Sequence, residues 1–119
     1  MASTEQPKPA STHTKSRNAT VSTPTDEGDF ERATRGFIAS YPGGRINDPS
    51  GRMVTDTNRY DFIRQSPEAP DTVNPSLWRH ARLNANHGLF EVADGVWQVR
   101  GYDISNITFI KGTQGWVVI

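Results

Sequence analysis

The chain of 119 residues contains no cysteine, which excludes a disulfide framework and a thiolate zinc site. Any metal ion therefore has to be held by His, Asp or Glu. The 13 acidic residues balance the 13 basic ones, and the lack of a basic excess argues against a nucleic-acid partner. No apolar run approaches the roughly 18 residues that a membrane span needs, so we expect no membrane-spanning segment.

Hydrophobic residues are also scarce. They make up 34% of the chain, and the mean hydropathy is -0.66. The usual fraction is about 45–50% in a count that adds Gly. We therefore expect one small domain at most, without a generous core.

The first 24 residues are rich in Ser, Thr and Pro and contain no aromatic side chain. This composition predicts a disordered tail over residues 1–24, because such a segment has little apolar surface to bury. No apolar stretch follows its basic residues, so it is not a secretory signal peptide, and we expect a cytoplasmic protein, with export left open. A transit peptide is the alternative, although an amphipathic Arg-rich pattern is missing.

Residues 25–71 predict a helix followed by an irregular hairpin segment. The helix is indicated by four apolar residues at helical spacing: Phe30, Ala33, Phe37 and Ile38. We expect it to end before the glycines of Tyr41–Gly44. A type I turn over Asp48–Gly51 then predicts a small hairpin, and Arg59–Ile63 is expected to be extended.

Residues 72–119 begin with the best-specified helix. Asn74 is a favoured N-cap, Pro75 suits the first helical position, and Gly88 is expected to close the helix. The spacing of Val73 and Trp78 is that of a hydrophobic staple. The predicted buried stripe consists of Leu77, Trp78, Ala81 and Ala85, whereas Arg79, Arg82 and Asn86 are expected to face outward.

From Leu89 onward the spacing of the apolar residues changes from that of a helix to that of β-strands. Asp94-Gly95 predicts a hairpin between strands at 90–92 and 96–99, and a second hairpin is expected to join 104–110 to 116–119. The result is an antiparallel meander with one apolar face, for which Val96, Val99 and Ile107 are candidates. Its final strand is an apolar edge with no protecting charge.

The residues that could carry chemistry form no known site pattern. The three histidines, His13, His80 and His87, show neither His-x-His nor His-Glu-x-x-His spacing, and no Gly-x-Ser-x-Gly elbow occurs. We therefore assign no catalytic, cofactor-binding or metal-binding residue. In the turn Arg100–Asp103 the arginine could hold an anion bidentately, although a solvated turn is the more common arrangement.

Several motifs nevertheless occur together in a fixed order. They are Asp29-Phe30, Arg35–Ile38, Thr72–Arg79, Leu83-Asn84, His87–Val92, Gln98–Gly101, Asp103 and Ser105-Asn106. With this set, residues 29–119 resemble the N-terminal part of the zinc-dependent alkylsulfatases (SDS hydrolase type) of the metallo-β-lactamase superfamily. The resemblance implies an α+β fold: short helices followed by an antiparallel meander, as the incomplete N-terminal portion of an αββα sandwich.

The same resemblance implies a function for a longer protein. It implies hydrolysis of primary alkyl sulfate esters to alcohol and sulfate at a binuclear zinc centre on a His-x-His-x-Asp-His motif beyond this chain, and a homodimer. No zinc ligand of the family maps onto this sequence, so we expect the chain alone to bind no zinc and to be inactive. Alkyl sulfate is a substrate only of the full-length protein.

Two other interpretations remain open. The chain could be a non-catalytic partner-binding or structural β module, or it could pair with a separately made remainder. The bare apolar strand at Val117–Ile119 favours the fragment interpretation, because a module that stands alone normally protects its sheet edge.

Overall fold

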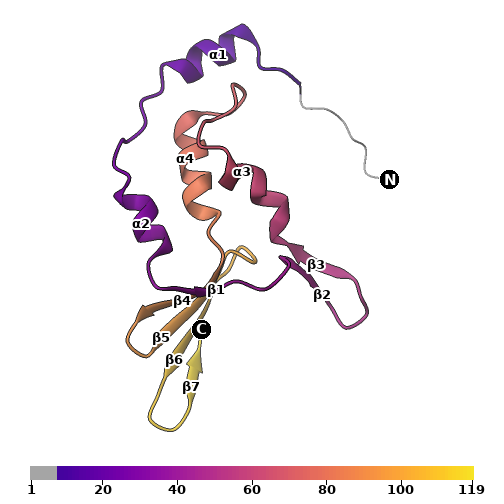
Figure 1. Ribbon diagram of the computed structural model, residues 1–119, viewed down its shortest axis with the longest axis vertical. Helices are drawn as coiled ribbons and strands as arrows, with labels where there is room; N and C mark the ends of the chain where they lie inside the picture. Colours follow the sequence, from indigo (N-terminus) through magenta and orange to yellow (C-terminus); the bar gives the residue numbers. More distant parts are fainter. Residues whose placement is uncertain (1–7) are drawn as a thin grey trace.

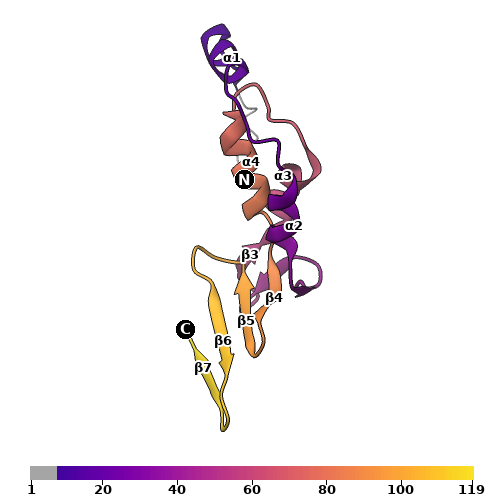
Figure 2. The same ribbon diagram turned by 90° about the vertical axis from the view of Figure 1, so that its left-hand side faces the viewer.

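The computed structural model describes residues 8–119, which form an open α+β arrangement. The α+β class predicted from the sequence is thus confirmed. Helices gather at one end of the molecule and a sheet extends from the other (Figures 1 and 2). The radius of gyration is 18.1 Å, whereas a compact domain of this length would have roughly 13.5 Å. The described residues therefore do not close around a single core.

The sheet has five antiparallel strands in the order β1-β4-β5-β6-β7. Their bounds are Phe37–Ala39 for β1, Gly88–Ala93 for β4, Val96–Arg100 for β5, Ile107–Lys111 for β6 and Trp116–Val118 for β7. The predicted meander is confirmed, since β4 to β7 are neighbours in both sequence and space. Strand β1 lies at the edge beside β4, an addition that the local pattern does not predict.

The first predicted helix is shorter than its apolar spacing suggests. Helix α2 (Gly28–Thr34) ends before Gly36, and Phe37 and Ile38 belong to strand β1, so the prediction that they lie on a helix is wrong. Gly36 has a φ of 74°, a left-handed conformation that turns the chain out of the helix. Its carbonyl then accepts a hydrogen bond of 2.8 Å from the backbone N–H of Glu91 in β4.

The predicted small hairpin is confirmed as β2 (Arg45–Asn47) and β3 (Met53–Asp56). Its turn is held by Asp48, whose carboxylate accepts from the backbone N–H groups of Ser50 and Arg52. The segment that follows is helical and not extended as predicted: η1 spans Thr57–Tyr60 and α3 spans Asp61–Gln65. The Asp56 side chain caps this turn by accepting from the N–H of Asn58 at 3.0 Å.

Helix α4 (Pro75–Asn84) has the predicted cap, because Asn74 accepts from two backbone N–H groups of the first turn. The helix ends at Asn84, and Gly88 starts β4, so the predicted C-terminal role of Gly88 is wrong. Trp78 is buried as expected, whereas Leu77 is 61% exposed. Arg79 is not turned outward as predicted but packs toward α2.

Part of the predicted tail is ordered. Helix α1 (Thr12–Ala19) has Ser11 as its N-cap, and Lys15 forms an ion pair of 3.0 Å with Asp71. A side-chain cap and an ion pair thus hold a helix whose apolar content is too low to predict it. Residues 1–7 of the predicted tail lie outside the described part of the chain.

Both faces of the sheet are apolar, not one as predicted. The register places Val96 on the same face as Phe90, and Val99 and Ile107 on the opposite face. Phe90 is 1% exposed and is one of two buried apolar side chains among residues 8–119, Trp78 being the other. Large apolar side chains of β6 and β7 are exposed: Ile107, Trp116, Val117 and Val118. No helix in the described part of the chain has the length and apolarity to cross a bilayer.

Replacing Gly36 by alanine tests the role of the β1–β4 junction. An added Cβ would lie 2.0 Å from the carbonyl oxygen of Glu91, whereas at Gly43, with a similar φ of 77°, it meets nothing within 4 Å. Backbone strain alone costs about 1–2 kcal/mol at either site. We expect Gly36→Ala to lower the free energy of unfolding by clearly more than Gly43→Ala, measured by urea denaturation. Equal losses would contradict a close approach of Gly36 to β4.

Candidate functional site

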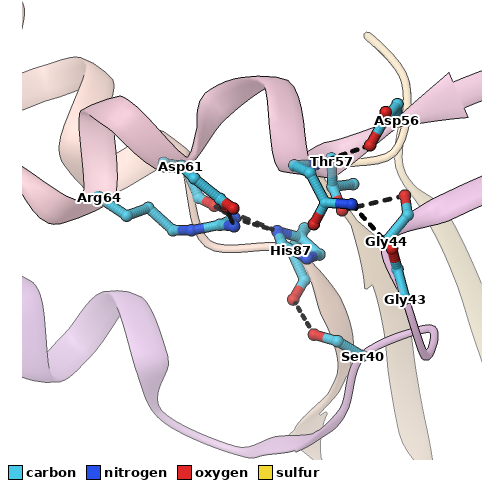
Figure 3. A network of polar contacts seen from close by, with 10 residues as sticks. Ser40, Gly43, Gly44, Asp56, Thr57, Asp61, Arg64 and His87 are labelled. Atoms are coloured by element: carbon cyan, nitrogen blue, oxygen red, sulfur yellow. Dashed lines mark hydrogen bonds and ion pairs between the residues drawn. The ribbon is translucent and has the colours of Figure 1, made fainter.

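A polar network centred on His87 lies where the helices meet the sheet (Figure 3). Arg64, at the end of α3, donates from Nη1 to His87 Nδ1 at 2.8 Å and to the carbonyl of Ala85 at 3.4 Å. Arg64 also forms an ion pair with Asp61, one turn earlier on α3. Because a guanidinium only donates, Nδ1 of His87 is the acceptor, and its ring proton lies on Nε2.

The network continues to strand β1 and to the loop after β5. The Ser40 hydroxyl donates to the carbonyl of His87 at 2.8 Å, and the backbone N–H of Tyr41 donates to the hydroxyl of Tyr102 at 2.8 Å. The rings of His87 and Tyr102 meet edge to face at 5.5 Å. At Gly101, with a φ of 80°, an added Cβ would lie 2.7 Å from the Cβ of His87. This close approach requires glycine.

His87 and Tyr102 also line a pocket of about 730 Å³ between the β2–β3 hairpin, α4 and the loop after β5. Its remaining wall is largely apolar and includes Ile46, Val54 and Ile63. In this network the hydrogen bonds hold the imidazole and phenol in place. No serine hydroxyl of the described residues contacts a histidine ring nitrogen, so the network is a positioning device and not a nucleophile–base pair.

The structure separates the three histidines. His13 is exposed on α1, His80 is exposed on α4, and His87 lies between α4 and β4 with Nδ1 already engaged. Over residues 8–119 there is no group of three or more His, Asp or Glu side chains placed to hold a metal ion. A catalytic zinc site usually takes three protein ligands. The His, Asp and Glu side chains of these described residues therefore do not fit a zinc centre.

A second network joins α2 to α4. Asp29 accepts from Nη2 of Arg32 at 2.6 Å and from Nη2 of Arg79 at 3.0 Å, and Arg79 also donates to the carbonyl of Asp26 at 2.7 Å. The guanidiniums of Arg79 and Arg82 lie over the ring of Phe30. The hydrogen bond from Arg32, and then that from Arg79, lower the pKa of Asp29 below the ordinary value of 3.8.

The sequence does not predict the role of Arg64. It predicts an extended segment over Arg59–Ile63, directly before Arg64, and not the helix that carries Asp61 and Arg64. In an extended segment, Asp61 and Arg64 would point to opposite faces. The missed signal is local: Asp61 and Arg64 stand three residues apart, the spacing of an ion pair on a helix, and Asp56 precedes them as a cap. The predicted turn at Arg100–Asp103 does contribute, through Gly101 and Tyr102.

Comparison with known proteins gives a consistent answer. No protein-family model matches the chain. It is 44% identical over 114 residues to a linear primary-alkylsulfatase of Pseudomonas sp., 50% identical over 96 residues to the alkyl/aryl-sulfatase BDS1 of Saccharomyces cerevisiae, and 46% identical over 115 residues to an (R)-specific secondary-alkylsulfatase of Pseudomonas sp.. These matches cover 93%, 80% and 94% of this chain, but 17%, 15% and 17% of the relatives.

A solved structure agrees with these relatives. The stereoselective inverting sec-alkylsulfatase Pisa1 of Pseudomonas sp. superposes with a TM-score of 0.84 at 45% identity, over 93% of this chain and 18% of that one. The described residues are thus an α+β segment that has the structure of part of a larger enzyme. The chain belongs to the alkylsulfatase family, and it spans about a sixth of the length of the curated relatives that it matches.

Replacing Arg64 tests the His87 network. Arg64→Met removes the donor to His87 Nδ1 and leaves Asp61 without its partner. We expect a loss of about 1.5–3 kcal/mol in the free energy of unfolding, the usual range for hydrogen bonds to a charged group. We also expect the ¹⁵N shifts of the His87 ring to move toward a mixture of tautomers.

The matched control is Arg59→Met, because Arg59 is exposed on the neighbouring η1 turn and forms no ion pair among the described residues. Unchanged His87 ring shifts in Arg64→Met would contradict the geometry of the network.

The pKa of Asp29 predicts an acid-sensitive contact between α2 and α4. Because the folded-state pKa is lowered, the contribution to stability is fully present above the unfolded value near 3.8 and is lost as the pH falls through the lower folded value. We expect the melting temperature to fall below pH 4 in the unmodified chain and to fall less in Asp29→Asn. Thermal melts followed by circular dichroism measure this difference, and parallel curves would rule out the contribution of Asp29.

Proposed function

We propose that this chain is part of an alkylsulfatase that hydrolyses alkyl sulfate esters, primary ones in particular, to alcohol and sulfate. The observation that carries the proposal is the 44–50% identity to three alkylsulfatases of differing specificity. The solved sec-alkylsulfatase supports it, because its backbone follows the described residues with a TM-score of 0.84. The preference for primary over secondary esters is a proposal about specificity, because the relatives include both a primary- and a secondary-alkylsulfatase.

The proposed role of this segment is to supply the opening strands of an αββα sandwich of the metallo-β-lactamase type. Both faces of the sheet carry exposed apolar side chains, because Trp116 on one face of β7 and Val117 on the other are each more than half exposed. Burying such surface is the main driving force of folding, at about 25 cal/mol per Å². A further layer over the sheet would supply that burial.

The proposed enzyme uses a binuclear zinc centre, and this segment supplies none of its ligands. When bound, such a centre lowers the pKa of a water molecule and thereby provides the nucleophile for ester hydrolysis. The described residues do not fit that centre, because His80 and His87 stand apart and Arg64 occupies Nδ1 of His87. No step of the reaction is therefore assigned to a residue of this chain. A homodimer of the complete enzyme is part of the same proposal.

Sulfate release from sodium dodecyl sulfate tests the proposal. We expect the protein encoded by the complete reading frame to release sulfate, to lose this activity on treatment with a zinc chelator, and to regain it with added zinc. The 119-residue chain alone is expected to release none. A complete reading frame without a His-x-His-x-Asp-His motif, or a complete protein that binds alkyl sulfates without cleaving them, would favour a non-catalytic module instead.

A further inference from the structure

Arg100, at the end of β5, is held in an unusual environment. Its guanidinium lies over the ring of Phe90 with its Cζ 3.5 Å from the ring centroid, and Phe90 is only 1% exposed. The side chain of Arg100 forms no ion pair or hydrogen bond with any described residue, and its Nε is buried without a partner. Buried polar groups are nearly always hydrogen-bonded, so the Nε–H of Arg100 lacks the acceptor that such a group normally has.

The other partly buried arginines show how this chain normally satisfies such groups. Arg79 also packs over an aromatic ring, but it donates to Asp29 and to the carbonyl of Asp26. Arg64 donates to His87 and pairs with Asp61. Arg82 also has a buried Nε without a partner, but its Nη1 donates to the carbonyl of Pro67 at 3.4 Å. The side chain of Arg100 has no acceptor at all among the described residues, and burial lowers its pKa.

The pocket that Arg100 lines has room for the missing acceptor. It measures about 630 Å³ and is also lined by Arg32 and by the asparagines Asn84, Asn86 and Asn106. Amide and guanidinium groups donate to oxyanions, and an arginine binds a carboxylate or sulfate through two parallel N–H groups. Arg32 is already paired with Asp26 and Asp29, and Asn86 donates to the carbonyl of Leu83 at 2.8 Å. The remaining donors of this wall, Arg100, Asn84 and Asn106, suit an anion with at least two oxygens.

Two carboxylates line the same pocket, but both have other partners. Asp29 accepts from Arg32 and Arg79, and Asp103 accepts from the backbone N–H of Ile104 at 2.7 Å. Neither bonds to Arg100.

We propose that the pocket between α2, the end of α4 and the loop after β5 is an oxyanion site, with Arg100 as its principal ligand. The oxyanion is either a free sulfate or a carboxylate side chain from a part of the protein outside residues 8–119. Stacking on Phe90 holds the guanidinium of Arg100 in place, and Gly101, the next residue in the wall, lets the chain pass close to His87. The site is defined by this chain alone and does not depend on the proposed hydrolysis.

The test follows the Nε–H resonance of Arg100 in ¹⁵N-labelled 119-residue chain. The resonance is assigned by its loss in Arg100→Lys and by its contacts with the ring of Phe90. Sodium sulfate, sodium acetate and sodium chloride are titrated separately at equal ionic strength. We expect a saturable shift with sulfate or acetate and none with chloride. The variants are titrated through the backbone amide of Gly101, and by this signal we expect Arg100→Lys to weaken the binding about tenfold or more. Arg59→Lys is the matched control and is expected to bind like the unmodified chain.

Each outcome decides the proposal. Tighter saturation by sulfate than by acetate identifies a free sulfate as the occupant, and tighter saturation by acetate identifies a carboxylate side chain. The absence of a saturable shift with both anions overturns the proposal. So does a resonance that is already shifted without anion and reverts in Asp103→Asn, since Asp103 would then be the partner. If Arg100→Lys fails to fold, the titration of the unmodified chain still decides, and the sulfatase activity of the complete protein is tested independently.

Discussion

The pairing of β4 on both of its edges is the constraint on which the rest of this structure depends. On one side β4 pairs with β1, where the carbonyl of Gly36 accepts from Glu91 at 2.8 Å, and on the other side it pairs with β5. Phe90, in the middle of β4, is the most deeply buried apolar side chain among the described residues. The helical end is attached here as well, because Arg64 of α3 donates to Nδ1 of His87, just before β4. A shift of β4 would therefore disturb the sheet and the polar network together.

The sheet alone buries few of its apolar side chains. Apolar side chains lie on both faces of the sheet, as in strands that are covered on two sides. Those of β7 remain exposed. The proposed sandwich would explain this pattern, since each face would then have a layer to pack against. The match to about a sixth of each relative is consistent with that proposal.

Arginine side chains make many of the tertiary contacts between the helices. Arg79 joins α4 to α2, and Arg64 joins α3 to His87. Arg100 stacks on Phe90 as Arg79 stacks on Phe30, but its side chain has no acceptor among the described residues.

Elements with strong local signals could be predicted from the sequence. The cap at Asn74, the turn at Asp48–Gly51 and the hairpin at Asp94-Gly95 depend on interactions between residues close in the chain, and all three are present. The ordered motifs also identified the family, now supported by the comparisons.

The positions of the edge strand and of the paired arginine side chains could be found only from the tertiary structure. Phe37 fits a helical stripe as well as a strand, and its pairing with β4, 53 residues away, decides between them. The inward turn of Arg79 depends on Asp29, 50 residues away, and the network at His87 depends on Arg64, 23 residues away. Periodicity along the chain carries no information about such partners. The sequence by itself therefore determined the local turns, the caps and the family, whereas the edge strand and the paired arginines were decided only by contacts between distant segments.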